Sequence, residues 1–130
     1  MGCALYTNNT TNAALAANAQ VPFGSTIHRK GRALTLEGNE IAIRGGCNDY
    51  AHVSGVANLV ATEAGDVQLT IYVDGVAALT VGDTAAAAGD YVAIPFDIVV
   101  KGGCCGVRRM TARVGEAVTV AAFPVTVTTV

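Results

Sequence analysis

The sequence predicts an all-β fold in a single domain: an antiparallel β-sandwich, preferably a jelly roll. Many short segments, roughly eight to ten, alternate apolar and polar residues and are separated by Gly, Asn and Asp turns. Together with the absence of any convincing helical pattern, this is typical of a sandwich or barrel. The length of 130 residues suits one domain.

The first part of the chain carries no clear pattern of strand or helix. Residues 1–20 are polar and rich in Asn, Thr and Ala. We therefore expect an irregular N-terminal anchor segment over 1–20, which orders only against a partner, and the β-sandwich over 21–130. Val21–Phe23 then predicts a short strand, which Pro22 would confine to a sheet edge.

Alternation defines the strands of the sandwich. Val67–Val73 alternates over its whole length and leads into Asp74–Gly75, the strongest hairpin signal in the sequence. A second hairpin is expected at Gly38–Asn39, and residues 82–89 are expected to form a loop of small residues. The expected strands cover residues 25–29, 32–37, 40–44, 49–62, 67–73, 76–81, 91–100, 107–114 and 117–130.

The chain is short of charge. Only 14% of its residues are charged and 52% are hydrophobic, whereas an average domain has about 25% charged residues. The segments 49–62 and 117–130 carry apolar residues on both faces, so both faces need to be covered. Another copy of the chain covers them most simply, and we therefore expect a symmetric oligomer.

Charge and hydropathy exclude several functions. A net charge of -2 argues against nucleic acid as the main partner. No apolar run approaches the roughly 18–20 residues of a membrane-spanning helix. The first residues lack the basic and apolar regions of a signal peptide, so secretion by that route is not expected.

Four cysteines are present, at positions 3, 47, 104 and 105. Adjacent cysteines are poorly placed to chelate one tetrahedral zinc ion, and a disulfide between neighbours is strained. Free thiols are the favoured interpretation for Cys3, Cys47, Cys104 and Cys105. A bridge from Cys47 to one of the adjacent pair, or a metal site, stays open as an alternative.

The sequence offers few groups for catalysis. His28 and His52 are its two histidines, and a nucleophile pair of Cys47 with His52 is conceivable because five residues across a turn can bring them together. No nucleophile elbow, phosphate loop or zinc-protease motif occurs. We therefore expect a protein that is not an enzyme, without catalytic, cofactor-binding or metal-binding residues. A calcium site built from turn carboxylates is a weaker alternative, since no Asp-x-Asp spacing concentrates ligands.

Two basic clusters have two interpretations. They are either solvated edge positions that discourage aggregation, or a surface that docks on an acidic partner or an anionic glycan. The candidate docking residues are His28, Arg29, Lys30, Arg32, Arg108, Arg109 and Arg113. Three tyrosines, Tyr50, Tyr72 and Tyr91, are either a carbohydrate platform or anchors in the core or an interface.

Six features together resemble a known family. They are the segments 4–11, 21–26, 36–46 and 65–76, Tyr50 at the start of a long strand, and a cysteine-bearing loop before a last strand of Val and Thr. The pattern is similar to that of small virion proteins of tailed phages and prophages of Gram-positive gut bacteria. Those proteins share their architecture with the trimeric jelly rolls of the C1q and tumour-necrosis-factor (TNF) type. The resemblance implies a homotrimer on the virion and brings no catalytic residue with it.

The expected function is that of a non-enzymatic phage virion structural protein. It would be a homotrimeric capsid decoration or head-associated protein that packs onto other virion proteins and assembles in the bacterial cytoplasm. The alternative is a receptor-binding module of a phage fibre or appendage that recognises a cell-surface glycan. The candidate trimer contacts are Val56, Val60, Tyr72, Val118 and Val120.

Overall fold

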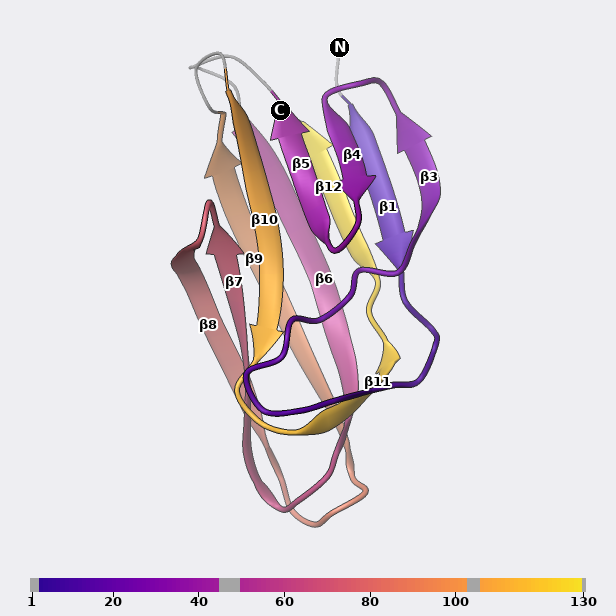
Figure 1. Cartoon of the computed structure of the whole chain (residues 1–130), viewed down its shortest axis with the longest axis vertical. Helices are drawn as coiled ribbons and strands as arrows, with labels where there is room; N and C mark the ends of the chain where they lie inside the picture. The colour runs from indigo at the N-terminus through magenta and orange to yellow at the C-terminus, as the bar shows by residue number, and fades with distance from the viewer. Residues whose placement is uncertain (1–2, 45–49, 103–105, 130) are drawn as a thin grey trace.

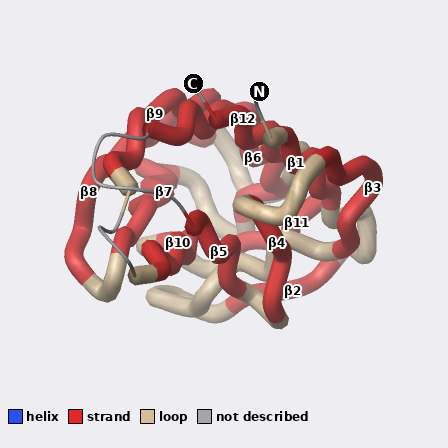
Figure 2. Tube along the Cα trace, turned by 90° about the horizontal axis from the view of Figure 1, so that it is seen from above, coloured by secondary structure: helices blue, strands red, loops and turns tan. Residues whose placement is uncertain are grey.

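A computed structural model describes residues 3–44, 50–102 and 106–129. This part of the chain contains strands and no helix, so it also holds no helix that could cross a membrane. The strands form two antiparallel sheets packed face to face, which confirms the predicted sandwich (Figures 1 and 2). The strands are β1 (Ala4–Asn8), β2 (Ala13–Leu15), β3 (Ser25–Lys30), β4 (Leu34–Glu37), β5 (Glu40–Arg44), β6 (Tyr50–Ala61), β7 (Gly65–Val73), β8 (Val76–Ala85), β9 (Tyr91–Lys101), β10 (Val107–Val114), β11 (Val118–Ala122) and β12 (Val125–Thr129).

The first sheet, called sheet A, is built around β6. One edge of β6 pairs with β9 along nearly its whole length. The other edge pairs with β12 over its first half and with β11 over its second. Beyond these, β1 lies between β12 and β3, and β2 pairs with β11.

The second sheet, called sheet B, has the order β4-β5-β10-β7-β8. Its two hairpins agree with the turns predicted at Gly38–Asn39 and Asp74–Gly75. Asp74 and Gly75 both have positive φ, of 53° and 81°, as tight two-residue hairpin turns require.

The core lies between the sheets and is completed by three phenylalanines. The rings of Phe23 and Phe123 stack at a centroid distance of 5.4 Å, and Phe96 tilts against Phe123 at 5.9 Å. Residues that the alternation predicts on one face share a face in the structure. Val53 and Leu59 of β6, for example, both lie in the core. Such aromatic pairs add about 0.5–1.5 kcal/mol beyond the burial of their surface.

The N-terminal segment differs from the expectation. Residues 4–8 form β1, an internal strand of sheet A, and Leu5 is part of the core. Asn9 is also buried; its Nδ2 donates to the Pro22 carbonyl at 3.0 Å and its Oδ1 accepts from the Thr11 backbone N–H at 3.1 Å. An anchor that orders only on a partner therefore does not describe residues 4–15, and the expected boundary at residue 20 is wrong. The pattern is hidden because β1 is short and one of its two inward residues is Thr7.

Two further expectations need correction. Val21–Phe23 is no strand: Val21 and Phe23 are buried, and the Val21 N–H donates to the Ala112 carbonyl at 2.8 Å. The start of the expected loop 82–89 belongs to β8, which continues to Ala85 beside β7.

The sandwich has open sheet edges on one flank. Among the described strands, β8 pairs only with β7, and β9 pairs only with β6. The two strands lie side by side, one from each sheet (Figure 2). Pro95 lies on the open strand β9, where its missing N–H breaks no ladder.

Candidate interaction surfaces

The outward side of sheet A carries a patch without charge. Val56 and Val60 of β6 are cross-strand partners of Pro95 and Tyr91 of β9, and their buried neighbours point inward. Ala93, opposite Asn58, lies between them and is exposed. We call the residues Val56, Val60, Tyr91, Ala93 and Pro95 the apolar face. Tyr91 is its most exposed member, with 78% of its surface accessible.

The same side of sheet A becomes polar toward the start of β6. His52 Nε2 contacts the Oδ1 atom of Asp97 on β9, and both side chains are exposed. This contact engages the His52 side chain at the surface. Cys47, the expected partner of His52 in a nucleophile pair, lies outside the described residues.

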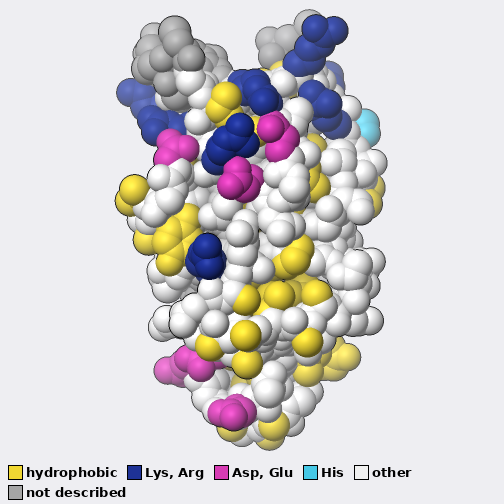
Figure 3. Space-filling model, viewed as in Figure 1, with side chains coloured by type: hydrophobic (Ala, Val, Ile, Leu, Met, Phe, Trp, Pro, Cys, Tyr) yellow, Lys and Arg dark blue, Asp and Glu magenta, His cyan; other side chains and the backbone are white. Residues whose placement is uncertain are grey.

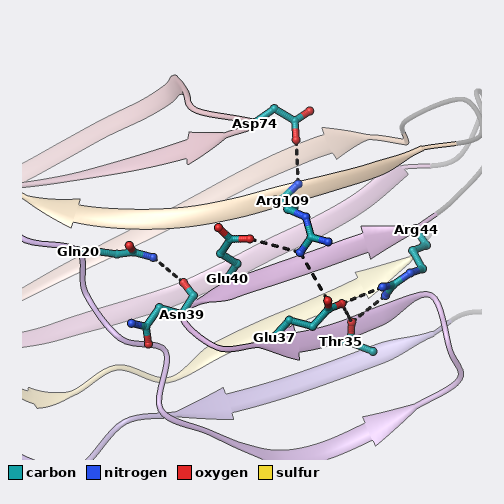
Figure 4. A network of polar contacts seen from close by, with 8 residues as sticks. All are labelled: Gln20, Thr35, Glu37, Asn39, Glu40, Arg44, Asp74 and Arg109. Carbon is teal, nitrogen blue, oxygen red and sulfur yellow. Dashed lines mark hydrogen bonds and ion pairs between the residues drawn. The ribbon is translucent and has the colours of Figure 1, made fainter.

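The outward side of sheet B carries a network of charged groups (Figure 4). The Arg109 guanidinium lies 3.5 Å from Glu37 and 3.3 Å from Glu40, and Arg44 donates to Glu37 at 2.8 Å. Hydrogen bonds from Arg44 and then Thr35 lower the pKa of the Glu37 carboxyl to about 2. The part of this outer face that β4, β5 and β10 form is thus covered by paired charges.

Asp74 extends the network to the β7–β8 turn. Its carboxylate accepts from the Arg109 backbone N–H at 3.0 Å and from the Arg108 side chain at 2.9 Å. These two bonds, the backbone bond first, lower the pKa of Asp74. Gln20 donates to the Asn39 carbonyl at 2.9 Å beside the same network.

The two outer faces therefore differ in kind. Directly opposite Arg109 on β5, Ala42 is fully buried although it lies on the outward side of its strand, because the charged side chains cover it. No charged side chain of the described residues covers Ala93 or Tyr91 in this way, and both are exposed. Paired charges suit contact with water, whereas an uncovered apolar face suits contact with another protein surface.

The structure separates the predicted docking residues into two groups. His28, Arg29 and Lys30 lie near the end of β3, with Arg32 in the following turn, at the end of the molecule where Figure 3 shows Lys and Arg gathered. Arg29 Nε donates to the Leu34 carbonyl of β4 at 3.0 Å and so links the two sheets.

The second group lies on β10 and is already engaged. Arg108 and Arg109 bind the acidic groups described above, and Arg113 donates to the Asn18 carbonyl at 3.1 Å. Sequence reasoning missed Lys101, which ends β9 at the same end of the molecule as Lys30. Lys101 has no basic neighbours in the sequence, so no cluster of charge indicated a role for it.

Acidic residues gather at the opposite end of the molecule, in the loops that follow β6, β8 and β10 (Figure 3). A cavity of about 410 Å³ lies there, lined in part by Glu63, Asp66 and Glu116. Within the described ranges, no three His, Cys, Asp or Glu residues are grouped so that they could hold a metal ion.

The comparisons with known proteins concern the fold. No family model matches the sequence, and neither does the sequence of any curated protein. Among solved structures, murine APRIL at pH 5.0 matches with a TM-score of 0.72 at 12% identity, over 98% of both chains. The PRD1 vertex protein P5 matches with a TM-score of 0.62 at 17% identity, over 98% of this chain and 94% of that one. The globular domain of zebrafish complement 1qA gives 0.58 at 9% identity, over 96% and 94%. The fold is a C1q/TNF-like jelly roll.

On this jelly roll, the predicted trimer contacts have different surroundings. Val56 and Val60 lie on the apolar face, and Tyr72 is half-buried on the outer side of sheet B; their role as contacts stays a prediction. Val118 and Val120 are wrong as contacts, because both lie in the core with 1% and 0% exposure. The final segment bends at 123–124 between β11 and β12, so its valines face inward on both sides of the bend.

The jelly roll does not bring the three candidate tyrosines together. Tyr50 and Tyr91 pair with Lys101 and Val60, at opposite ends of the β6–β9 ladder, and Tyr72 belongs to the other sheet. Cys3 is a half-buried free thiol. The proposals for Cys47, Cys104 and Cys105 lie outside the described residues.

Proposed function

We propose that the protein is a homotrimeric, non-enzymatic structural module of a phage particle, where it decorates the capsid by packing onto it. The jelly roll and the sequence resemblance to small virion proteins support this function. The likeness to a vertex protein, at 17% identity, agrees with it.

The main observation in favour of the trimer is the contrast between the outer faces of sheets A and B. Sheet B presents the paired charges of Arg44, Arg109 and Glu37, whereas sheet A presents the apolar face. In a chain with so little charge, an uncovered apolar surface that continues across two strands is the expected place for a subunit contact.

The open flank of β8 and β9 provides the complementary surface. Val76 is 69% exposed on β8, Val99 is 58% exposed on the outward side of β9, and the outer edges of both strands pair with no described strand. Long open edges with exposed apolar residues need to be covered. In the proposed trimer, the flank of one copy covers the apolar face of the next.

This contact joins two different surfaces, so it repeats around a ring until the ring closes. A typical stable interface removes about 800 Å² from each partner, roughly an eighth of the 6438 Å² surface of this chain. The function requires no chemistry beyond such packing.

The trimer is tested with a matched pair of variants. Ala93→Arg places a charge on the apolar face, and Gln68→Arg places the same charge on the exposed outer side of sheet B. We expect native mass spectrometry to show three times the 13.1 kDa chain mass for the wild type and Gln68→Arg, and monomers for Ala93→Arg. Equal effects of the two substitutions would place the contact elsewhere.

The location is tested on particles. An antibody against the purified protein should label intact phage particles released by the bacteria that produce it, at repeated positions on the head in electron micrographs. Label on tail fibres would favour the receptor-binding alternative, and unlabelled particles would contradict a virion role.

A further inference from the structure

We propose that one end of the molecule, formed by Arg29, Lys30, Arg32 and Lys101 and called the basic end, docks on a carboxylate-rich protein surface. The opposite end then points away from that surface. This inference rests on the proposed function and deepens it, because it names the surface by which the trimer attaches.

The cations of the basic end are available for a partner. Arg44, Arg108 and Arg109 are engaged in ion pairs within the chain, and Arg113 is bound to a carbonyl. By contrast, the four cations of the basic end form no ion pair with any acidic residue in the described ranges. Four of the eight Lys and Arg residues therefore have no acidic partner among the described residues, and all four lie at one end.

Exposed apolar side chains accompany these cations. Ile27 is 60% exposed on β3 beside Arg29 and Lys30. Tyr50 is 45% exposed and is the direct cross-strand partner of Lys101. Protein interfaces combine Arg with aromatic and aliphatic groups, whereas a merely solvated edge needs charge alone. The mixture therefore favours docking over solvation.

The local structure also presents β3 to a partner. All six residues of β3 are exposed, and β3 pairs only with β1 among the described strands. The bond from Arg29 Nε to the Leu34 carbonyl holds that side chain in place, and its two terminal nitrogens make no bond to a described residue. A fixed guanidinium with free donors is suited to bind a carboxylate.

The far end of the molecule gives the complex a direction. Its acidic residues form no ion pair with Lys or Arg in the part of the chain that the structure describes; they are Glu63, Asp66, Asp83, Asp90 and Glu116. An acidic surface attracts the basic end and repels this one. The charges thus orient the molecule before contact is made.

The same features identify the class of partner. Four cations with a net charge of -2 and an acidic far end make a weak binder of nucleic acid. The exposed side chains of Ile27 and Tyr50 need an apolar surface beside the negative charges of the partner, and a folded protein supplies both. A sulfated glycan supplies negative charge without such an apolar surface.

The test uses three immobilised probes: poly-L-glutamate, heparin and a duplex DNA of about 20 base pairs. We expect the full chain to bind poly-L-glutamate at about 50 mM salt and to be released at about 300 mM, because surface charges are screened. Arg32→Glu should weaken this binding about tenfold or more, and Lys30→Glu with Arg32→Glu should abolish it. Arg113→Glu is the matched control, an equal reversal of charge on β10, and should change binding less than about twofold.

The outcomes separate the possibilities. Lack of binding to poly-L-glutamate, or equal losses for Arg32→Glu and Arg113→Glu, would overturn the proposal. Binding to heparin or DNA without binding to poly-L-glutamate would overturn it in favour of a glycan or a nucleic acid. The native mass of each sample is measured in parallel. If the wild type is a monomer, the trimer fails, but the comparison of Arg32→Glu with Arg113→Glu still decides the docking surface.

Discussion

Val60 and Tyr91 are direct cross-strand partners on β6 and β9, and both side chains lie on the outward side of sheet A. The Tyr91 side chain is 78% exposed, whereas aromatic side chains usually lie in a core or an interface. The proposed trimer explains this pair, because the flank of a neighbouring copy covers it.

The first prediction concerns Tyr91. Tyr91→Lys replaces an apolar contact by a charge that would be buried in the trimer, so we expect the concentration at which trimers dissociate to rise at least about tenfold. Gln68→Lys, on the outer side of sheet B, is the control and should leave that concentration unchanged. Analytical ultracentrifugation over a dilution series measures both. An unaltered trimer in Tyr91→Lys would exclude this residue from the contact.

The second prediction concerns β1. Leu5 lies in the core between the sheets, and Leu5→Ala should lower the free energy of unfolding by about 2–4 kcal/mol. Thr26→Ala, at an exposed position of the neighbouring strand β3, should cost little. Urea unfolding followed by circular dichroism gives both values. A stability unchanged by Leu5→Ala would mean that the N-terminal strand is not part of the sandwich.

The third prediction concerns Gly55, near the point where β6 changes partner from β12 to β11. A Cβ atom here would lie 2.5 Å from the Pro124 carbonyl oxygen and 3.0 Å from the Phe96 ring. Gly55→Ala should therefore cost about 1–3 kcal/mol of stability. Gly115→Ala is the matched control, since its Cβ would meet no atom closer than 3.8 Å. Equal melting temperatures of the two variants would contradict the close packing of Gly55 against Pro124 and Phe96.

The fourth prediction concerns pH. The pKa of Glu37 is lowered to about 2 in the folded chain, from a usual value of 4.5. A lowered folded-state pKa stabilises the fold above the usual value, and this contribution disappears as the pH falls from about 4.5 to about 2. Glu37→Gln should thus be less stable than the wild type at pH 7 and equal to it near pH 2. Urea unfolding measures the free energy of unfolding of both proteins. If the difference between the wild type and Glu37→Gln stays constant with pH, the ion pair of Glu37 with Arg44 does not stabilise the fold.

Much of the fold follows from alternation along the chain. The segment of β7 shows it clearly, and Asp74–Gly75 marks its hairpin by residues that accept positive φ. Alternation fails where a strand is short, as in β1, and at 123–124, where the side-chain direction changes. Alternation alone therefore predicts the wrong surroundings for Val118 and Val120, which lie in the core.

The candidate surfaces could be predicted only in part. A run of basic residues indicates a charged surface, but whether those side chains form ion pairs depends on acidic residues that are distant in the sequence. Arg108 and Arg109 have such partners in Asp74 and Glu40, whereas Arg32 has none among the described residues. Val56 and Val60 lie on the outward side of β6 because side chains alternate along a strand and the neighbouring Ala57 and Leu59 are buried.

The native mass of the wild-type protein decides whether the chain forms the proposed trimer. Sedimentation equilibrium at neutral pH, from about 1 to 100 µM, covers the range in which a specific assembly is stable. We predict one species with three times the 13.1 kDa mass of the chain. A monomer over the whole range would rule out the trimer.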